Sequence, residues 1–187
     1  MDQKECIILI GLPYSGKTQF YRDRYSFLTR FAPEKYDTKY QARMQLEACL
    51  KNANSFVVDS TNHTRRERKH YIVAAKANGF RIIGYYFQSD VDECIKRCNA
   101  RRFSDFGLLK VLDAISYYTD KLNYFTDLYA VRPPADTEKV GTPKKKMNGK
   151  RIQEIYEEME EPSYDEEFDE LYLTYFNEEH FETEPWA

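Results

Sequence analysis

The residues with the clearest chemical signature form a glycine-containing segment near the start of the chain. The segment Gly11–Thr18 reads GLPYSGKT, fits the pattern G-x-x-x-x-G-K-[ST] and follows the apolar run 6–10. Its glycines let the backbone curl, so that successive N–H groups point at phosphate oxygens where the next helix begins. A nucleoside triphosphate, ATP, is the expected ligand, and the residues expected to contact it are Gly11, Pro13, Tyr14, Ser15, Gly16, Lys17 and Thr18.

The same segment predicts part of a phosphoryl-transfer site. Lys17 is expected to bridge the terminal phosphates, and the Thr18 hydroxyl to bind Mg²⁺. A second Mg²⁺ ligand is Asp59, which ends the apolar strand 55–59. Ligands gather at the carboxyl ends of strands in α/β sheets. By itself Asp59 could equally be a capping or turn residue, but a phosphate-binding loop nearby favours the metal role.

Two arginines are candidates for charge stabilisation during transfer. Arg97 and Arg101 stand four apart on a helix predicted to begin after Asp90, so they share one face. We expect them to close over the triphosphate as a lid. The alternative is that they pair with surface carboxylates such as Asp92 or Glu93.

A general base for the acceptor hydroxyl is harder to assign from the residues. Asp37 is the only carboxylate between Glu34 and Glu47, in the connection after Pro33, and is the candidate. A base must lie within hydrogen-bond reach of the proton that it accepts, which spacing alone does not establish.

Hydrophobic patterning predicts the elements that position these residues. Strands are expected at 6–10, 55–59 and 81–87, and helices at 17–28, 40–51, 64–78 and after Asp90. Strands that alternate with helices predict a parallel sheet with right-handed crossovers. Later come an aromatic helical stretch at 108–129, a basic run at 144–151, a helix at 152–160 and a strand at 168–176. The last ten residues read as a frayed tail.

Length and composition suit one domain. The chain has 187 residues, of which 42% are hydrophobic, and we predict one domain over 1–176 followed by an acidic tail over 177–187. No apolar run approaches a membrane span, and the polar start is unlike a secretion signal. The four cysteines form no C-x-x-C pair. We therefore expect reduced thiols, a cytoplasmic location and no membrane partner.

The net charge of −3 conceals a division along the chain. All 28 Lys and Arg residues lie at or before Arg151, whereas 14 of the 31 Asp and Glu residues follow it. A basic body suggests an anionic partner, for which the acidic end could compete. The alternative is a solvated acidic end with no role beyond solubility.

Taken together, the motifs resemble the kinase domain of the polynucleotide 5′-hydroxyl kinases, within the wider AAA-type group of P-loop kinases. The phosphate-binding loop carries Tyr14 where that family usually has glycine. The family's Asp-x-Thr-Asn motif appears at 59–62, with its arginine at Arg68. The segment 161–170 resembles the family's closing segment, with Glu167 replacing a glycine. The resemblance covers 4–102 and 152–176.

This resemblance implies a three-layer P-loop kinase-like α/β fold, with 103–151 as an inserted helical or loop lid region. It also implies nucleotide contacts from Asn62 and Arg68, and it strengthens Asp37, followed by Thr38, as the hydroxyl-activating residue. Tyr40 stands where the phage type carries an arginine for the acceptor phosphate.

Three functions remain open at this point. The first is a kinase that moves the γ-phosphate of ATP to the 5′-hydroxyl of a nucleic acid. The basic residues of the chain are compatible with this function. So are four aromatic residues that either stack on bases or lie in the core, namely Tyr117, Tyr118, Tyr124 and Phe125. The second is a kinase of a sugar, nucleoside or antibiotic. The third is an ATP-binding interaction protein without kinase turnover. The oligomeric state is not predicted.

Overall fold

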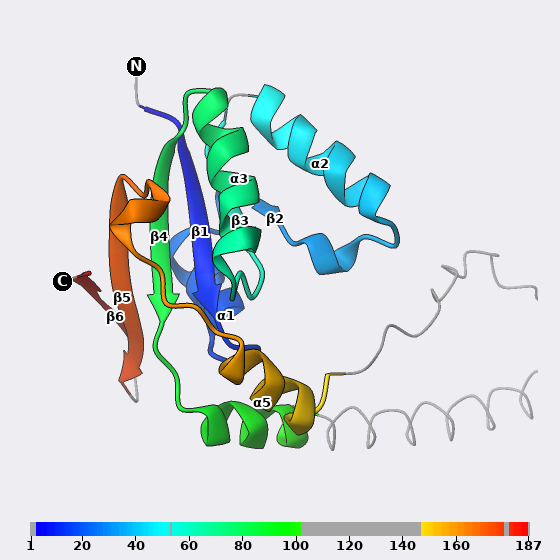
Figure 1. Cartoon of the computed structure of the whole chain (residues 1–187), viewed down its shortest axis with the longest axis vertical. Coiled ribbons are helices and arrows are strands. Elements are labelled where there is room, and N and C mark those ends of the chain that lie inside the picture. The colour runs from blue at the N-terminus through cyan, green and yellow to red at the C-terminus, as the bar shows by residue number, and fades with distance from the viewer. Residues whose placement is uncertain (1–2, 53, 102–146, 178–179, 187) are drawn as a thin grey trace, which may run out of the picture.

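The chain builds one mixed sheet with helices on both faces (Figure 1). The computed structural model describes residues 3–52, 54–101, 147–177 and 180–186. The strands lie in the order β2-β3-β1-β4-β5-β6, and all neighbours pair in parallel except β5 and β6. Their bounds are β1 (Glu5–Gly11), β2 (Thr29–Phe31), β3 (Phe56–Asp59), β4 (Arg81–Phe87), β5 (Glu170–Asn177) and β6 (His180–Pro185). The predicted mostly parallel α/β fold is confirmed.

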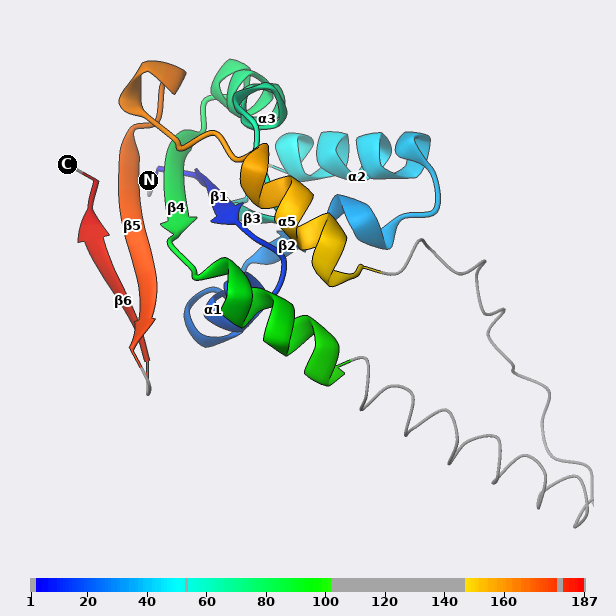
Figure 2. The ribbon, with the colours of Figure 1, turned by 60° about the horizontal axis from the view of Figure 1, so that its bottom comes forward.

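The helices form the outer layers. Helices α2 and α3 cover one face of the sheet and α1 covers the other (Figures 1 and 2). A helix over 91–101 and α5 pack together beyond the carboxyl ends of the strands. The bounds are α1 (Lys17–Arg24), α2 (Lys39–Lys51), α3 (Arg65–Ala77) and α5 (Gly149–Glu157), with short 3₁₀ helices η1 (Pro33–Lys35) and η2 (Tyr164–Glu166).

Strand β1 divides the core between the two faces. Successive side chains of a strand point to opposite faces, and a central parallel strand is buried on both. Cys6, Ile8 and Ile10 therefore pack with the residues of α2 and α3. Ile7 and Leu9 pack on the other side with Phe20 of α1. The continuous apolar run predicted a central strand for this reason.

The C-terminal residues correct one expectation. Instead of a frayed tail, His180–Pro185 forms β6, paired antiparallel with β5. Phe181 of β6 is buried against Phe20, with ring centroids 5.5 Å apart. Arg24 of α1 donates a 2.7 Å hydrogen bond to the Phe181 carbonyl oxygen. The strand was missed because Glu182 and Glu184 stand between Phe181, Thr183 and Pro185, and so polar a segment also fits a solvated tail.

Other boundaries shift for local reasons. The helix expected over 17–28 ends at Arg24, and the three residues Thr29–Phe31 form β2, a strand too short to show a period. Helix α5 begins at Gly149 because the Asn148 side chain accepts a hydrogen bond from Arg151 N. The end of the basic run is therefore helical. The expected helix at 108–129, which includes Tyr117, Tyr118, Tyr124 and Phe125, lies outside the described residues, as does Lys144–Lys146.

Phe181 provides a test of the β6 packing. Phe181→Ala is expected to lower the free energy of unfolding by about 3–5 kcal/mol, because it opens a cavity between α1 and the sheet. Phe176→Ala is the matched control, since Phe176 is 46% exposed, and it should cost less than half as much. Urea unfolding measures both. Equal losses in the two variants would mean that β6 does not pack as described.

Candidate active site

The phosphate-binding loop leaves the carboxyl end of β1 in an unusual backbone conformation. Gly11, Tyr14 and Gly16 have φ angles of 147°, 67° and 97°, all in the region that favours glycine. A Cβ at Gly16 would lie 2.8 Å from the Phe181 ring, so β6 supports the loop from behind. Tyr14 holds its left-handed conformation at a steric cost of about 1–2 kcal/mol. That conformation explains why glycine is usual there.

Lys17 lies inside the curl of the loop. Its Nζ donates to the carbonyl oxygens of Gly11 (2.8 Å) and Leu12 (2.5 Å), and lies 3.3 Å from Ser15 Oγ. Burial lowers the pKa of Lys17 to about 8, against the opposing charge of Asp59. A phosphate anion entering the loop would offset this shift, because it stabilises the charged ammonium group.

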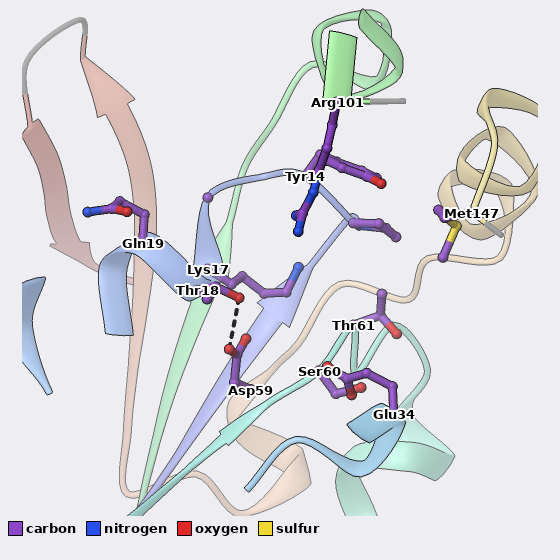
Figure 3. A pocket seen from close by; sticks show the side chains of 12 residues that line it. Tyr14, Lys17, Thr18, Gln19, Glu34, Asp59, Ser60, Thr61, Arg101 and Met147 are labelled. Atoms are coloured by element: carbon purple, nitrogen blue, oxygen red, sulfur yellow. Dashed lines mark hydrogen bonds between the residues drawn. The ribbon is translucent and has the colours of Figure 1, made fainter. Parts of the chain in front are cut away.

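Thr18 and Asp59 meet as the sequence predicted. Thr18 Oγ1 donates a 2.9 Å hydrogen bond to Asp59 Oδ2 (Figure 3). Asp59 is buried at the end of β3, directly beside β1. A hydroxyl and a carboxylate oxygen are hard ligands of the kind that Mg²⁺ prefers. The two predicted metal ligands therefore lie together.

Arg30 of β2 joins this pair and was missed by the sequence analysis. Its Nε donates to Asp59 Oδ2 over 2.6 Å, and its Nη2 donates to Thr18 Oγ1 over 3.1 Å. Its guanidinium also lies 5.5 Å from the centre of the Tyr21 ring. Arg30 thus neutralises Asp59 with a cation supplied by the protein. Side chains alternate along a strand, and Phe31 packs on the face that α2 and α3 cover. Arg30, the residue before it in β2, therefore points to the opposite face, where Thr18 and Asp59 lie.

A pocket of about 530 Å³ opens where the loop, β3 and η1 meet (Figure 3). Its lining includes most of the predicted nucleotide and metal residues, together with Arg101, which points into it from the helix over 91–101. The full set is Pro13, Tyr14, Gly16, Lys17, Thr18, Gln19, Glu34, Asp59, Ser60, Thr61, Arg101 and Met147. The geometry thus joins the donor-side residues in one space.

Arg97 and Arg101, both expected to form a lid, have different surroundings in the structure. Arg101 lines the pocket, but Arg97 pairs with Glu93 at 3.1 Å, which is the alternative that the sequence left open. Arg97 Nη1 also lies 3.4 Å from the Tyr14 carbonyl oxygen. Arg97 therefore contacts the outside of the loop while Arg101 faces the ligand space.

Asn62 and Arg68, for which the resemblance implied nucleotide contacts, both contact other parts of the protein. Asn62 Nδ2 donates to the Leu9 carbonyl oxygen over 2.7 Å, which ties the segment after β3 to β1. Arg68 is fully buried, and its guanidinium donates to both carboxylate oxygens of Glu166 and to the carbonyl oxygens of Asn62 and Glu160. Arg68 therefore fastens the closing segment to α3, and neither residue lines the 530 Å³ pocket.

Asp37 also lies outside the lining of the 530 Å³ pocket. It lines a second pocket of about 440 Å³ with residues of α2, including Tyr40 and Met44. The carboxylate that enters the first pocket from this connection is Glu34. Sequence spacing could not separate the two, because both follow the short β2 strand closely.

The model of the AAA domain family matches residues 23–118, just over half of the chain. The chain belongs to the AAA domain family. A protein of Acanthamoeba polyphaga mimivirus, provisionally named a bifunctional polynucleotide phosphatase/kinase, is 27% identical over 130 residues. The match covers 68% of this chain but 31% of the viral protein, so the chain spans about a third of that relative's length.

Two solved structures share the fold of this AAA-family chain. Chaetomium thermophilum Kti12 in complex with ADP-AlF₃ has a TM-score of 0.55 at 17% identity, covering 93% of this chain and 90% of Kti12. A gluconokinase from Sinorhizobium meliloti 1021 has a TM-score of 0.50 at 11% identity, covering 94% and 84%. The fold is that of the P-loop kinases, and the family is one of ATP-binding, kinase-like domains. In the described ranges, no helix is long and apolar enough to span a bilayer.

The contact between Arg30 and Asp59 yields a prediction for the nucleotide-free protein. Arg30→Gln should lower the free energy of unfolding by about 1–3 kcal/mol, since it leaves a buried carboxylate without its cation. Mg²⁺ should restore part of that loss by binding the Thr18 and Asp59 oxygens that Arg30 no longer contacts. Urea unfolding with and without Mg²⁺ measures both effects.

Arg43→Gln is the matched control for this experiment. The Arg43 side chain is 72% exposed and pairs with Glu47 on α2, so its loss should change little. Mg²⁺ should raise the free energy of unfolding more in Arg30→Gln than in the unmodified protein. An equal or smaller gain in the variant would contradict the contact of Arg30 with the two metal ligands.

Proposed function

We propose that this chain is an ATP-dependent kinase that transfers the γ-phosphate to a hydroxyl, with the 5′-hydroxyl of a nucleic acid as the acceptor. The observation that carries the proposal is the convergence of Lys17, Thr18, Asp59 and Arg101 on one pocket. Phosphoryl transfer depends mainly on positioning and on charge stabilisation, and these residue types supply both.

The chain's own residues account for binding of the donor. Backbone N–H groups of the loop would hold the β-phosphate at the start of α1, and Lys17 would bridge the β- and γ-phosphates. Arg101 would approach the transferring group from the helix over 91–101, where its charge opposes the charge that spreads onto the equatorial oxygens. Met147 and Tyr14 border the same space and would limit the access of water.

Thr18 and Asp59 are suited to hold Mg²⁺. Their oxygens lie within one hydrogen bond of each other, and they already share a cation in the guanidinium of Arg30. When bound, Mg²⁺ would neutralise charge on the β- and γ-phosphates. Arg30 would then release Asp59, and its contact with Tyr21 gives it another place to pack.

The nucleic acid acceptor has two independent supports. The mimivirus relative carries a polynucleotide kinase name, and the first 151 residues hold all 28 basic side chains against 17 acidic ones. A basic surface attracts phosphate backbones at modest salt. A small hydroxyl compound is the second candidate acceptor, because the 530 Å³ pocket falls in the size range of small-ligand sites.

The acceptor test uses radiolabelled ATP and matched oligonucleotides. We expect label to enter DNA or RNA strands that end in a 5′-hydroxyl. The same strands with a 5′-phosphate are the control and should take up no label. Lys17→Ala should abolish transfer while leaving the fold intact, because the loop loses its phosphate-binding cation.

A panel of sugars and nucleosides is run beside the oligonucleotides. Label in a small molecule alone would replace the nucleic acid acceptor with the second candidate. ATP binding without transfer to any acceptor would overturn the kinase proposal and favour an ATP-binding interaction protein.

A further inference from the structure

The carboxylate of Glu34 has a fixed relation to the phosphate-binding loop. Strand β2 pairs with β3 in parallel, so that Phe31 lies opposite Val58, the residue before Asp59. Phe31 and Ala32 are buried, and Pro33 then starts the 3₁₀ turn η1, in which Lys35 N donates to the Ala32 carbonyl oxygen over 3.0 Å. The turn follows a paired strand, so it holds Glu34 at the edge of the pocket.

Glu34 lies on the side of the pocket that an acceptor could reach. Figure 3 shows it beside Ser60, on the side across from Arg101. The loop and Arg101 occupy the donor side. An attacking hydroxyl must approach the γ-phosphorus from the side opposite the leaving group, so a group that activates it belongs on this open side. Glu34 keeps part of its surface exposed to solvent there.

The charges around Glu34 suit a proton acceptor. Partial burial raises the pKa of Glu34, and the negative charge of Asp59 on β3 adds to the shift. A backbone hydrogen bond acts in the opposite direction, as do the charges of Arg30 on β2 and Lys17 on α1. A carboxylate whose pKa lies above its ordinary value is a stronger base, which suits it to accept a proton from a hydroxyl.

Asp37 has a different position and different contacts. Its backbone N–H donates to Gln41 Oε1 over 3.0 Å, beside the capping box that Thr38 and Gln41 form at the start of α2. Its side chain lines the pocket on α2. The local structure thus directs Asp37 to the helix start, away from Lys17 and Asp59.

We propose that Glu34, rather than Asp37, is the carboxylate that orients and deprotonates the acceptor hydroxyl. This rests on the proposed kinase function. The hydroxyl proton passes to a Glu34 carboxylate oxygen as the hydroxyl oxygen bonds to the γ-phosphorus of ATP. The bond from that phosphorus to the β–γ bridging oxygen breaks, its electron pair leaves with ADP, and Glu34 later returns the proton to water.

The test compares three isosteric variants on an acceptor that the unmodified protein phosphorylates. Glu34→Gln should lower kcat by about 10²–10⁴-fold, because the amide cannot accept the proton. Calorimetric ATP affinity should stay within about twofold. Glu47→Gln is the control and should leave kcat unchanged, because Glu47 pairs with Arg43 on α2 and lines neither pocket. Asp37→Asn tests the competing carboxylate and should lose far less than Glu34→Gln.

A pH profile separates a catalytic role from a structural one. In the unmodified protein, kcat should fall on the acid side with a midpoint above the ordinary range of a glutamate. This limb should vanish in Glu34→Gln. A Glu34→Gln variant with full kcat, or a larger loss in Asp37→Asn, would overturn the inference.

The failure of the proposed function has its own signature. If the unmodified protein phosphorylates no acceptor, the kinase proposal has failed, and water becomes the attacking hydroxyl in an ATP hydrolysis assay. Glu34→Gln should still lower that rate more than Asp37→Asn does. If hydrolysis is equal in both variants, Glu34 is not the activating carboxylate.

Discussion

The parallel pairing of β1 with β3 is the constraint on which the site depends. It sets Leu9 opposite Asp59, so the loop that follows β1 and the carboxylate that ends β3 reach the same edge of the sheet. The 2.9 Å hydrogen bond from Thr18 to Asp59 and the 2.7 Å bond from Asn62 to Leu9 both follow from that register. A slip of one residue would turn Asp59 to the other face and separate the two halves of the proposed metal site.

The C-terminal segment completes the site without contributing to its chemistry. Phe181 of β6 packs behind Gly16, and Glu166 forms a buried ion pair with Arg68 of α3. Since buried carboxylates are stable only when they are paired, Arg68 and Glu166 depend on each other to hold this segment against α3. Among the described acidic residues after Arg151, only Glu170, Glu182 and Glu184 lie on the paired strands β5 and β6, and the others lie on α5, on η2 and in the segments that connect them to β5.

Sequence patterning predicted the central strands, the phosphate-binding loop and the two metal-ligand candidates Thr18 and Asp59, because each follows from a short pattern of neighbouring residues. Two departures from the family pattern, Tyr14 and Glu167, have φ angles of 67° and 73°, so the backbone there keeps the shape that glycine usually provides. Arg30 and Glu34 were missed because their positions depend on β2, a three-residue strand defined by its pairing and not by its own period. Arg68, for which the resemblance implied a nucleotide contact, pairs with Glu166, since a motif arginine can bind a ligand or an internal carboxylate and sequence alone does not distinguish the two.

ATP affinity measured by calorimetry across a range of pH tests most directly whether Lys17 holds the phosphates. Burial lowers the pKa of Lys17 to about 8, so above that pH the nucleotide-free protein loses the ammonium proton that phosphate binding requires. Affinity should then fall with rising pH, by up to about tenfold for each pH unit, until the higher pKa of the bound lysine is reached. In Lys17→Met this slope should vanish and affinity should be low throughout. Binding by Lys17→Met as tight as that of the unmodified protein would contradict the account.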